Sequence, residues 1–486
     1  MPKRLAAWTE DSQVFALSAI DAGAYGICLA AFHPHLLVVD ARRRTLLFRN
    51  WPWSFRRAVE SRHIEENAAC IWSAVTESCI AKHTVAGMFP AFSTAFPLLR
   101  LYPSMIKTSD IEVQQLASVD SLAPLRPAWN ALARGVPFRN FDWLESWWRL
   151  YGAGPGKELF ALAVFDGNRE LIGLAPWYLE GSAAGRVIRF LGSGEVCSDY
   201  LTVLCRPRRE EDVTQALADW LCGFTSFSGG RPAWDQIELG GVDECDVTVA
   251  WLVEQLAARG NLIHRRSRSS CWRITLPGGW DQYLNMLSKS HRKQIRRLER
   301  DYFQTGRARL VTAANESELG RGLEALIRLH QRRRQSLGER GCFASSRFVA
   351  FHEQTANRLL RSGRLRLVWL EVDGQTVAVE YQVLGDGVVY AYQSGIEPDS
   401  LEHQPGRLIT LGGIKQAISE GRRAFDFLRG DESYKAHWRA KPRPALDIRV
   451  VANAPRARLR HNLWLASGNV KNWIKKGLRM SRIANQ

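Results

Sequence analysis

Residues 425–438, FDFLRGDESYKAHW, combine an apolar strand pattern with acids, a tyrosine, a lysine and a histidine. Asp426 lies inside the apolar run, and Gly430 ends it. Acyl transfer to an amine or hydroxyl uses such groups, because the acceptor must lose a proton and the leaving group must gain one. The pattern predicts a strand that delivers polar side chains to the mouth of a cleft, followed by a helix that closes it.

Two carboxylates are candidates for the general base. If Asp426 enters a cleft between strands, desolvation would raise its pKa and suit it to accept a proton. The alternative is a structural carboxylate paired with Arg422, Arg423 or Arg429. Glu380, in the strand pattern AVEYQ, is the second candidate, although an acid in such a run is more typical of the exposed face of a strand.

A turn before an amphipathic helix offers a place for an anion. The turn consists of Gln404, Pro405, Gly406, Arg407 and Leu408, and the helix pattern GRLITLGGIKQAISEG follows. A helix N-terminus carries unpaired N–H groups and partial positive charge, glycine permits close approach of a ligand, and arginine adds a fork for phosphate oxygens. The alternative is an ordinary turn and cap, because the spacing alone is not specific.

Secondary-structure patterns position these residues in the second of two similar halves. From about residue 110, strand patterns alternate with helix patterns, and each half has two strands around an Asp-Gly turn, at Asp166-Gly167 and Asp373-Gly374. Asn315 is a predicted N-cap, with Glu318 three residues later. The sequence therefore predicts mixed α/β sheets flanked by helices, in two tandem related domains.

The length of 486 residues favours several domains. We predict an N-terminal domain over 105–275, a C-terminal domain over 276–450 and a basic tail over 451–486. The first 104 residues lack a sustained period and are interpreted as a poorly structured extension or an over-called start before Met105.

Composition limits the partners and the compartment. The net charge of +17 favours an anionic substrate, cofactor or surface. The nine scattered cysteines have no zinc-ligand spacing, which predicts a reducing compartment and no metal, and no signal peptide or spanning segment is evident. We predict a cytoplasmic protein. Residues 456–482 form a basic amphipathic pattern that could lie on an anionic membrane or dock on its own domain. The basic residues of 288–300 form a second cluster, for which nucleic acid is a less favoured partner than solvent.

The runs HQPGRLITLGGIKQAISEG and RRAFDFLRGDESYKAHW, together with SKSHRKQIRRLER at 288–300, resemble the CelD-type (cellulose-biosynthesis-associated, BioF-like) acetyltransferase domain of the GNAT superfamily. The tandem halves also resemble Fem-type transferases, which use aminoacyl-tRNA. The resemblance implies acetyl-CoA or another acyl-CoA as co-substrate, held between two splayed strands with its pyrophosphate at the helix that begins near Arg407. The turn departs from the usual GNAT Q/R-x-x-G-x-G/A motif, because it has one glycine.

Within this resemblance, Tyr434 is expected to protonate the departing sulfur, or else to pack on the sheet. Lys435 and Tyr392 are expected to bind substrate, and Lys435 has pairing with Asp431 as its alternative. The matching turn of the first half, LCRPRREEDVTQ, has acids and no glycine, so we assign the CoA site to the second half only.

The resemblance favours an acyl-CoA-dependent N- or O-acyltransferase that acts on a sugar, polysaccharide or cell-envelope precursor. Two alternatives stay open at this point. One is a Fem-like aminoacyl-tRNA-dependent transferase, and the other is a non-catalytic GNAT-pair scaffold that binds membrane or nucleic acid.

Overall fold

The structure is a computed structural model that describes residues 111–182, 185–223 and 234–466, together with the backbone of three strands near the N-terminus. The chain divides into two units, Met1–Met105 and Ile106–Gln486. In the first unit, β1 (Ile27–Phe32), β2 (His35–Asp40) and β3 (Thr45–Arg49) form an antiparallel sheet. The prediction of a poorly structured extension over residues 1–104 otherwise lies outside the described residues.

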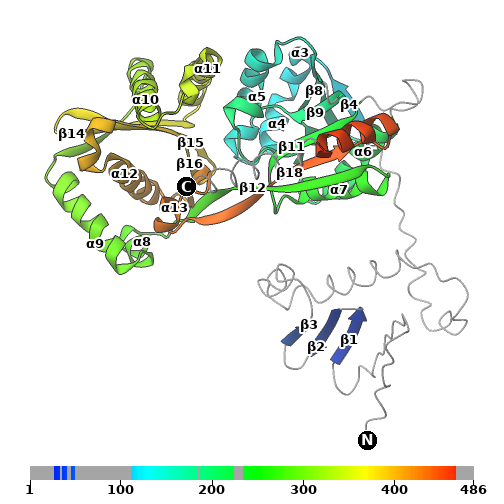
Figure 1. The fold of residues 1–486 in the computed structure, drawn as a ribbon, viewed down its shortest axis with the longest axis horizontal. Helices are drawn as coiled ribbons and strands as arrows, with labels where there is room; N and C mark the ends of the chain where they lie inside the picture. The colour runs from blue at the N-terminus through cyan, green and yellow to red at the C-terminus, as the bar shows by residue number, and fades with distance from the viewer. Residues whose placement is uncertain are drawn as a thin grey trace, which may run out of the picture. The chain divides into compact units, whose positions relative to one another are not determined.

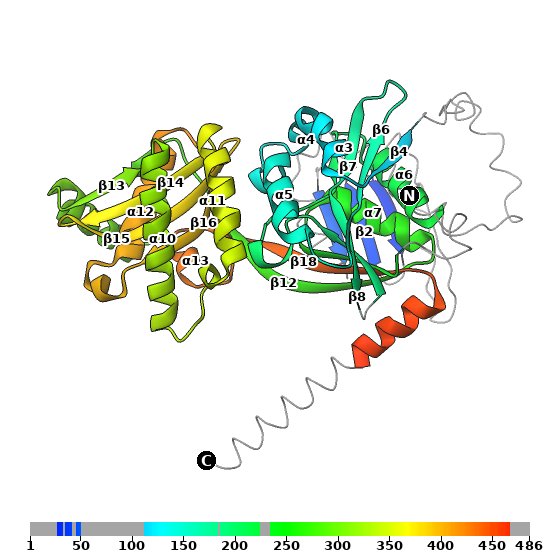
Figure 2. The ribbon, with the colours of Figure 1, turned by 90° about the horizontal axis from the view of Figure 1, so that it is seen from above.

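An eleven-stranded mixed sheet runs through both halves of the second unit (Figures 1 and 2). Its strands, in spatial order, are β13 (Ala308–Thr312), β14 (Leu365–Val372), β15 (Gln375–Gly385), β16 (Val388–Ile396), β17 (Ala424–Arg429), β12 (Leu262–Thr275), β18 (Lys441–Val451), β11 (Gln236–Asp243), β9 (Gly185–Phe190), β8 (Trp177–Ser182) and β5 (Lys157–Leu159). The two long strands β12 and β18 pair with each other and join the halves. Mixed α/β sheets flanked by helices, as predicted, are therefore present.

A smaller four-stranded sheet belongs to the first half. It has the order β10 (Leu204–Cys205), β7 (Leu171–Ala175), β6 (Ala161–Phe165) and β4 (Glu112–Leu116). The predicted Asp166-Gly167 hairpin is confirmed, because β6 and β7 pair in antiparallel fashion. Pro176 separates β7 from β8, so the hairpin strands continue into the large sheet rather than ending.

Helices cover both faces of the sheet in the second half. α10 (Glu316–Ser336) and α11 (Ser346–Arg361) lie over one face of β14–β16, and α12 (Pro405–Ser419) lies on the other (Figure 1). Asn315 caps α10 as predicted, since its Oδ1 accepts from the N–H of Glu318 at 3.0 Å. The hairpin at Asp373-Gly374 is also confirmed by the β14–β15 register. With both faces covered, β14 and most of β15 are buried, whereas β16 is buried only in its first three residues and at Gly395.

The core therefore has two parts. One contains the first half and the α10–α11 face, and the other contains α12 with Phe425 and Phe427. Gly412 and Gly413 let α12 approach the sheet closely, because a Cβ at Gly412 would lie 2.2 Å from Leu310 Cδ1.

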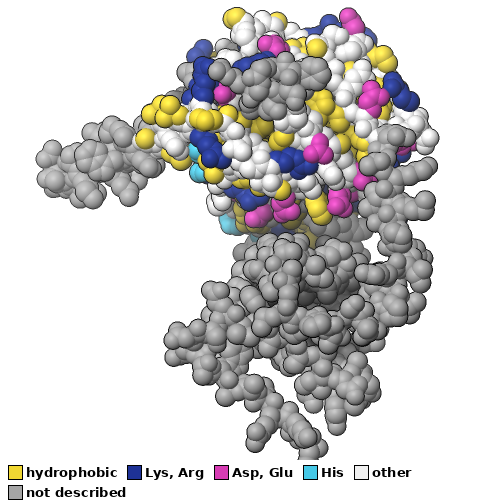
Figure 3. All heavy atoms as spheres, turned by 90° about the vertical axis from the view of Figure 1, so that its right-hand side faces the viewer, with side chains coloured by type: hydrophobic (Ala, Val, Ile, Leu, Met, Phe, Trp, Pro, Cys, Tyr) yellow, Lys and Arg dark blue, Asp and Glu magenta, His cyan; other side chains and the backbone are white. Residues whose placement is uncertain are grey.

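Residues 455–466 form a helix in which Ala457 and His461 are buried, and Arg460 pairs with Asp235 at 2.9 Å. Leu459 and Leu463, two members of the predicted apolar side, are 61% and 62% exposed. Charges of both signs are interspersed over the face in Figure 3, and hydrophobic side chains gather at its left edge. No helix of the described residues is long and apolar enough to cross a membrane. Membrane association through residues 456–482 stays a prediction, because residues beyond 466 lie outside the described ranges.

Candidate active site

Two parallel strands separate at the centre of the second half. β16 and β17 pair only from Val388↔Ala424 to Tyr390↔Asp426, although β16 continues to Ile396 and β17 to Arg429. Beyond these three pairs the backbone N–H and C=O groups of both strands have no ladder partner from each other, so a ligand can enter between them. The splayed strands expected from the resemblance are therefore present at the predicted place.

The N-terminus of α12 follows β16 and has the features that an anion requires. Gln404 adopts a left-handed conformation (φ +53°), and its side chain caps no backbone N–H of the helix. Within the described residues, no acceptor contacts the N–H of Gly406, whereas the N–H of Arg407 donates to the carbonyl of Gln404 at 2.9 Å. A Cβ at Gly406 would lie 3.0 Å from Ile396 Cδ1, so the absence of a side chain keeps this place accessible. The unpaired N–H of Gly406 and the partial positive charge of the helix N-terminus fit a phosphate group.

The other residues of the predicted turn have different positions. Arg407 is exposed and its Nη1 donates to Gln404 Oε1 at 2.7 Å, so the guanidinium lies beside the turn. Pro405 and Leu408 are buried, and their assignment to cofactor binding stays a prediction. Of the five residues assigned to cofactor binding, Gly406 offers an amide donor and Arg407 a guanidinium, whereas Gln404 accepts hydrogen bonds from Arg407.

Glu380 lies on β15 beneath α12 and is 5% exposed, so the expectation that it marks an exposed face is wrong. Helices cover both faces of this sheet, and alternation of polar and apolar residues no longer identifies the solvent side. Gln382 Nε2 donates to Glu380 Oε2 at 2.5 Å, and Arg366 Nη1 donates to Gln382 Oε1 at 3.3 Å. Burial raises the pKa of Glu380 to about 7 despite the hydrogen bond from Gln382. A carboxylate with this pKa can accept and release a proton at neutral pH.

Tyr434 begins the short helix α13 (Tyr434–His437) after β17. The side chain packs edge-on against Phe427, with ring centroids 5.8 Å apart, and is 47% exposed. Desolvation, followed by the negative charges of Glu432 and Glu380, raises its pKa above the usual value. The phenol therefore stays protonated at neutral pH.

Asp426 points away from α12. Its neighbours Phe425 and Phe427 pack in the core beneath that helix, and successive strand residues face opposite sides of a sheet. The carboxylate is fully buried, and Oδ2 accepts from Tyr200 Oη at 2.7 Å and from Arg273 Nε at 2.6 Å. Its partner is therefore Arg273 of β12 rather than Arg422, Arg423 or Arg429. These contacts favour the structural alternative, and a base role for Asp426 stays a prediction.

The two residues predicted to bind substrate lie in closed surroundings. Lys435 is 2% exposed, and its Nζ donates to the carbonyls of Arg429 and Gly430 at 2.9 Å each and pairs with Glu432 at 2.8 Å. Its ammonium thus fixes the end of β17, and the expected partner Asp431 instead accepts from Trp272 Nε1 at 3.0 Å.

Tyr392, on β16, donates from its hydroxyl to the carbonyl of Val196 at 2.5 Å and packs among aromatic rings of both halves. Burial raises its pKa well above the usual value. Its contacts are those of a residue that joins the halves, and sequence spacing could not reveal the partner 196 positions away.

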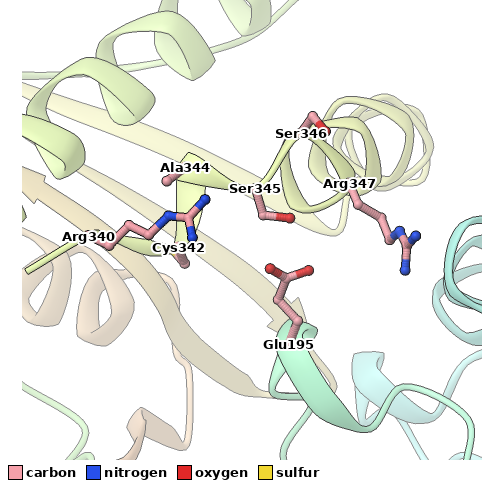
Figure 4. Close-up of a pocket in the computed structure, with 8 residues that line it drawn as sticks. Glu195, Arg340, Cys342, Ala344, Ser345, Ser346 and Arg347 are labelled. Carbon is pink, nitrogen blue, oxygen red and sulfur yellow. The ribbon is translucent and has the colours of Figure 1, made fainter.

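A cavity of about 490 Å³ lies between the halves, on the face of the sheet that α10 and α11 cover. Figure 4 shows Glu195 of the first half directed toward Ser345 and Arg340 of the loop between these helices. Glu195 is fixed by Tyr151, whose Oη donates to Oε2 at 2.8 Å. Ser345 caps α11 by accepting from the N–H of Phe348 at 3.3 Å. Side chains of both charge signs therefore line this cavity, which lies on the face of the sheet opposite α12. Elsewhere within 111–182, 185–223 and 234–466, no cluster of His, Cys, Asp and Glu could hold a metal ion.

Comparison with known proteins agrees with this geometry. Residues 289–436 match the acetyltransferase (GNAT) domain family. The chain is similar to the crystal structure of FemX, with a TM-score of 0.50 and 12% identity over 72% of this chain and 99% of that chain. Weaker likenesses include a tandem GNAT protein from the clavulanic acid biosynthesis pathway (TM-score 0.39, 13% identity, 71% of this chain and 99% of that chain) and the C-terminal domain of a putative lysylphosphatidylglycerol synthetase from Agrobacterium fabrum (TM-score 0.41, 10% identity, 70% and 95%).

No curated protein sequence matches significantly. The likeness to FemX concerns the fold, and it extends over both halves, whereas the family match is confined to the second. The chain contains a GNAT acetyltransferase domain and is an acyltransferase. The finer CelD-type assignment stays a prediction.

Proposed function

We propose that the chain, whose residues 289–436 match the GNAT acetyltransferase domain, transfers an acyl group from acyl-CoA to an amine or hydroxyl of a sugar or cell-envelope precursor. The observation that carries the proposal is the separation of β16 from β17 directly beside the uncapped N-terminus of α12. The co-substrate supplies an activated acyl group as a thioester. Its pyrophosphate would be held by the N–H of Gly406 and by Arg407.

The chain's own residues would divide the proton transfers between them. Glu380, with a pKa of about 7, is the group best suited to receive the acceptor's proton at neutral pH. Tyr434 stays protonated because its pKa is raised, so its hydroxyl can donate to the departing sulfur. Asp426 would hold Tyr200 and Arg273 in place and leave the proton transfers to the other two.

Calorimetric titration with acetyl-CoA tests the proposal. The wild-type chain should bind, and Gly406→Glu should abolish binding, because a carboxylate would replace the phosphate at the helix amides. Ser419→Glu is the matched control, since it adds the same charge at the opposite end of α12 and should bind as the wild type does. Absence of binding by the wild-type chain would contradict the use of acyl-CoA.

A Fem-like aminoacyl-tRNA-dependent transferase is the second candidate, and the likeness to FemX over 99% of that chain favours it. Binding of tRNA that weakens steeply with salt, in a chain that does not bind acetyl-CoA, would support this alternative. The two candidates therefore give opposite results in the same pair of titrations.

A further inference from the structure

A second cavity, of about 360 Å³, lies on the other side of the loop that carries Glu195. We call it the arginine cavity, because its walls contain five arginines: Arg189, Arg266, Arg268, Arg429 and Arg449. Its volume is within the range of ligand sites, roughly 300–1,000 Å³. It is built mainly from β9, β11, β12 and β18, and the residues between Ser193 and Leu201 form its rim.

Two carboxylates line this cavity, and each is shared by two arginines. Asp447 accepts from Arg266 Nη2 at 2.8 Å and from Arg268 Nη1 at 2.9 Å. Glu238 accepts from Arg449 Nη2 at 2.5 Å and pairs with Arg189 at 2.7 Å. Each guanidinium has five N–H donors, so the donors exceed the available carboxylate oxygens.

Unused donors remain in the walls. Arg449 Nη1 is buried and has no hydrogen-bond partner within the described residues, whereas Arg189 Nε lies 3.3 Å from Glu180 Oε2. Arg266 and Arg268 contact Asp447 through one nitrogen each, and their side chains are 65% and 37% exposed. Buried polar donors without partners are costly, and an anion that accepts from several guanidinium groups would satisfy them.

Arg429 joins the arginine cavity to the proposed active site. It ends β17, three residues after Asp426, and Asp199 and the carbonyl of Ser198 hold it at 2.6 Å and 3.0 Å. Arg429 therefore belongs both to the wall of the arginine cavity and to the end of the splayed strand β17. Trp464 at the cavity wall holds Arg449 in place, because the guanidinium carbon lies 3.6 Å from the centroid of its ring.

We propose that the arginine cavity binds a phosphate or diphosphate group of the acceptor. The inference rests on the proposed function, because it names the chemical class of the acceptor. Phosphate is favoured over a single carboxylate because five guanidinium groups surround the cavity. They exceed the four carboxylates that pair with them, which are Asp447 and Glu238 in the lining and Asp199 and Glu180 beside it.

The test is calorimetric titration of the full chain with inorganic pyrophosphate, in the Gly406→Glu background so that the helix α12 site does not contribute. Arg268→Gln should weaken pyrophosphate binding about ten-fold, the effect of losing one charge-assisted hydrogen bond. Arg265→Gln is the matched control: it removes the same charge from the neighbouring position of β12, and its side chain is exposed and outside the cavity. This control should bind as its parent does.

The possible outcomes separate the two proposals. If Arg268→Gln and Arg266→Gln both bind pyrophosphate as tightly as the parent, or if the parent shows no binding, the arginines only join strands and the inference is wrong. If acetyl-CoA fails to bind the wild-type chain while pyrophosphate binding still depends on Arg268, the cavity inference stands and the acyl-CoA proposal fails. Acetyl-CoA binding by Arg268→Gln in the wild-type background should equal that of the wild type, which also shows that the variant is folded.

Discussion

Replacement of Glu380 by glutamine should remove a pH dependence from the stability of the protein. The folded-state pKa is about 7 and the ordinary value is 4.5, because burial disfavours the carboxylate. Between these values the folded chain binds more protons than the unfolded chain, so its free energy of unfolding falls as pH rises through the window. A difference of about 2.5 pKa values corresponds to roughly 3 kcal/mol at most.

The assay is urea unfolding at pH 5 and at pH 8, monitored by tryptophan fluorescence, with the same protein preparations at both pH values. The wild type should lose roughly 2–3 kcal/mol more than Glu380→Gln between the two pH values, because the window begins slightly below pH 5. Glutamine retains the shape and can still accept from Gln382 Nε2. Glu353→Gln, at an exposed position of α11, is the matched control and should follow the wild type. Equal pH dependence in Glu380→Gln and the wild type would refute the claim that Glu380 is buried with a raised pKa.

The same variant tests the catalytic role separately. If Glu380 is the base, kcat/KM of the wild type should rise through an apparent pKa near 7, and this rise should be lost in Glu380→Gln. A stability effect without a change in the pH–rate profile would leave Glu380 as a structural group and move the base role elsewhere.

Two further substitutions address the neighbouring residues. Tyr434→Phe should lower kcat about 100-fold, with little change in KM for acetyl-CoA or in stability. Thiol release from acetyl-CoA measures kcat and KM. An unchanged kcat would show that the phenol takes no part in the proton transfers. Asp426→Ala should cost roughly 3–5 kcal/mol in urea unfolding, because it leaves the half-buried side chain of Arg273 and the buried side chain of Tyr200 without their acceptor. Asp426→Asn should cost less. Lost activity at wild-type stability in Asp426→Asn would instead favour a catalytic role.

Local signals in the sequence were sufficient for the elements that carry the site. The Asp373-Gly374 turn, the cap at Asn315 and the period of α12 depend on neighbours within a few residues, and the structure has each of them. The apolar runs LRLVWLEV and TVAVEY are consistent with strands that are buried on both faces. The acid in the second run, Glu380, nevertheless suggests a strand face that is exposed to solvent. The burial of Glu380 follows from the helices above and below it, and strand alternation contains no information about them.

The contacts of Asp426 and Lys435 could not be predicted because they depend on distant segments or on backbone. Tyr200 lies 226 positions before Asp426, and Arg273 lies 153 positions before it. Lys435 binds main-chain carbonyls at the end of β17. Because every residue has a main-chain carbonyl, the sequence gives no sign of this contact. Local charge pairing suggested Asp431 for Lys435 and Arg429 for Asp426. In the structure Lys435 pairs with Glu432, and Asp426 pairs with the distant Arg273.

The geometry of the active site depends on residues outside the family match. β12 ends at Thr275, where the sequence predicted a domain boundary, yet this strand pairs with both β17 and β18 and supplies Arg273 to Asp426. Tyr200, from the first half, supplies the other donor to the same carboxylate. The strand that forms one wall of the acyl cleft is therefore fixed by the first half. A second half expressed from residue 276 would lose β12 and expose the edge of β17, whose unpaired N–H and C=O groups β12 otherwise satisfies.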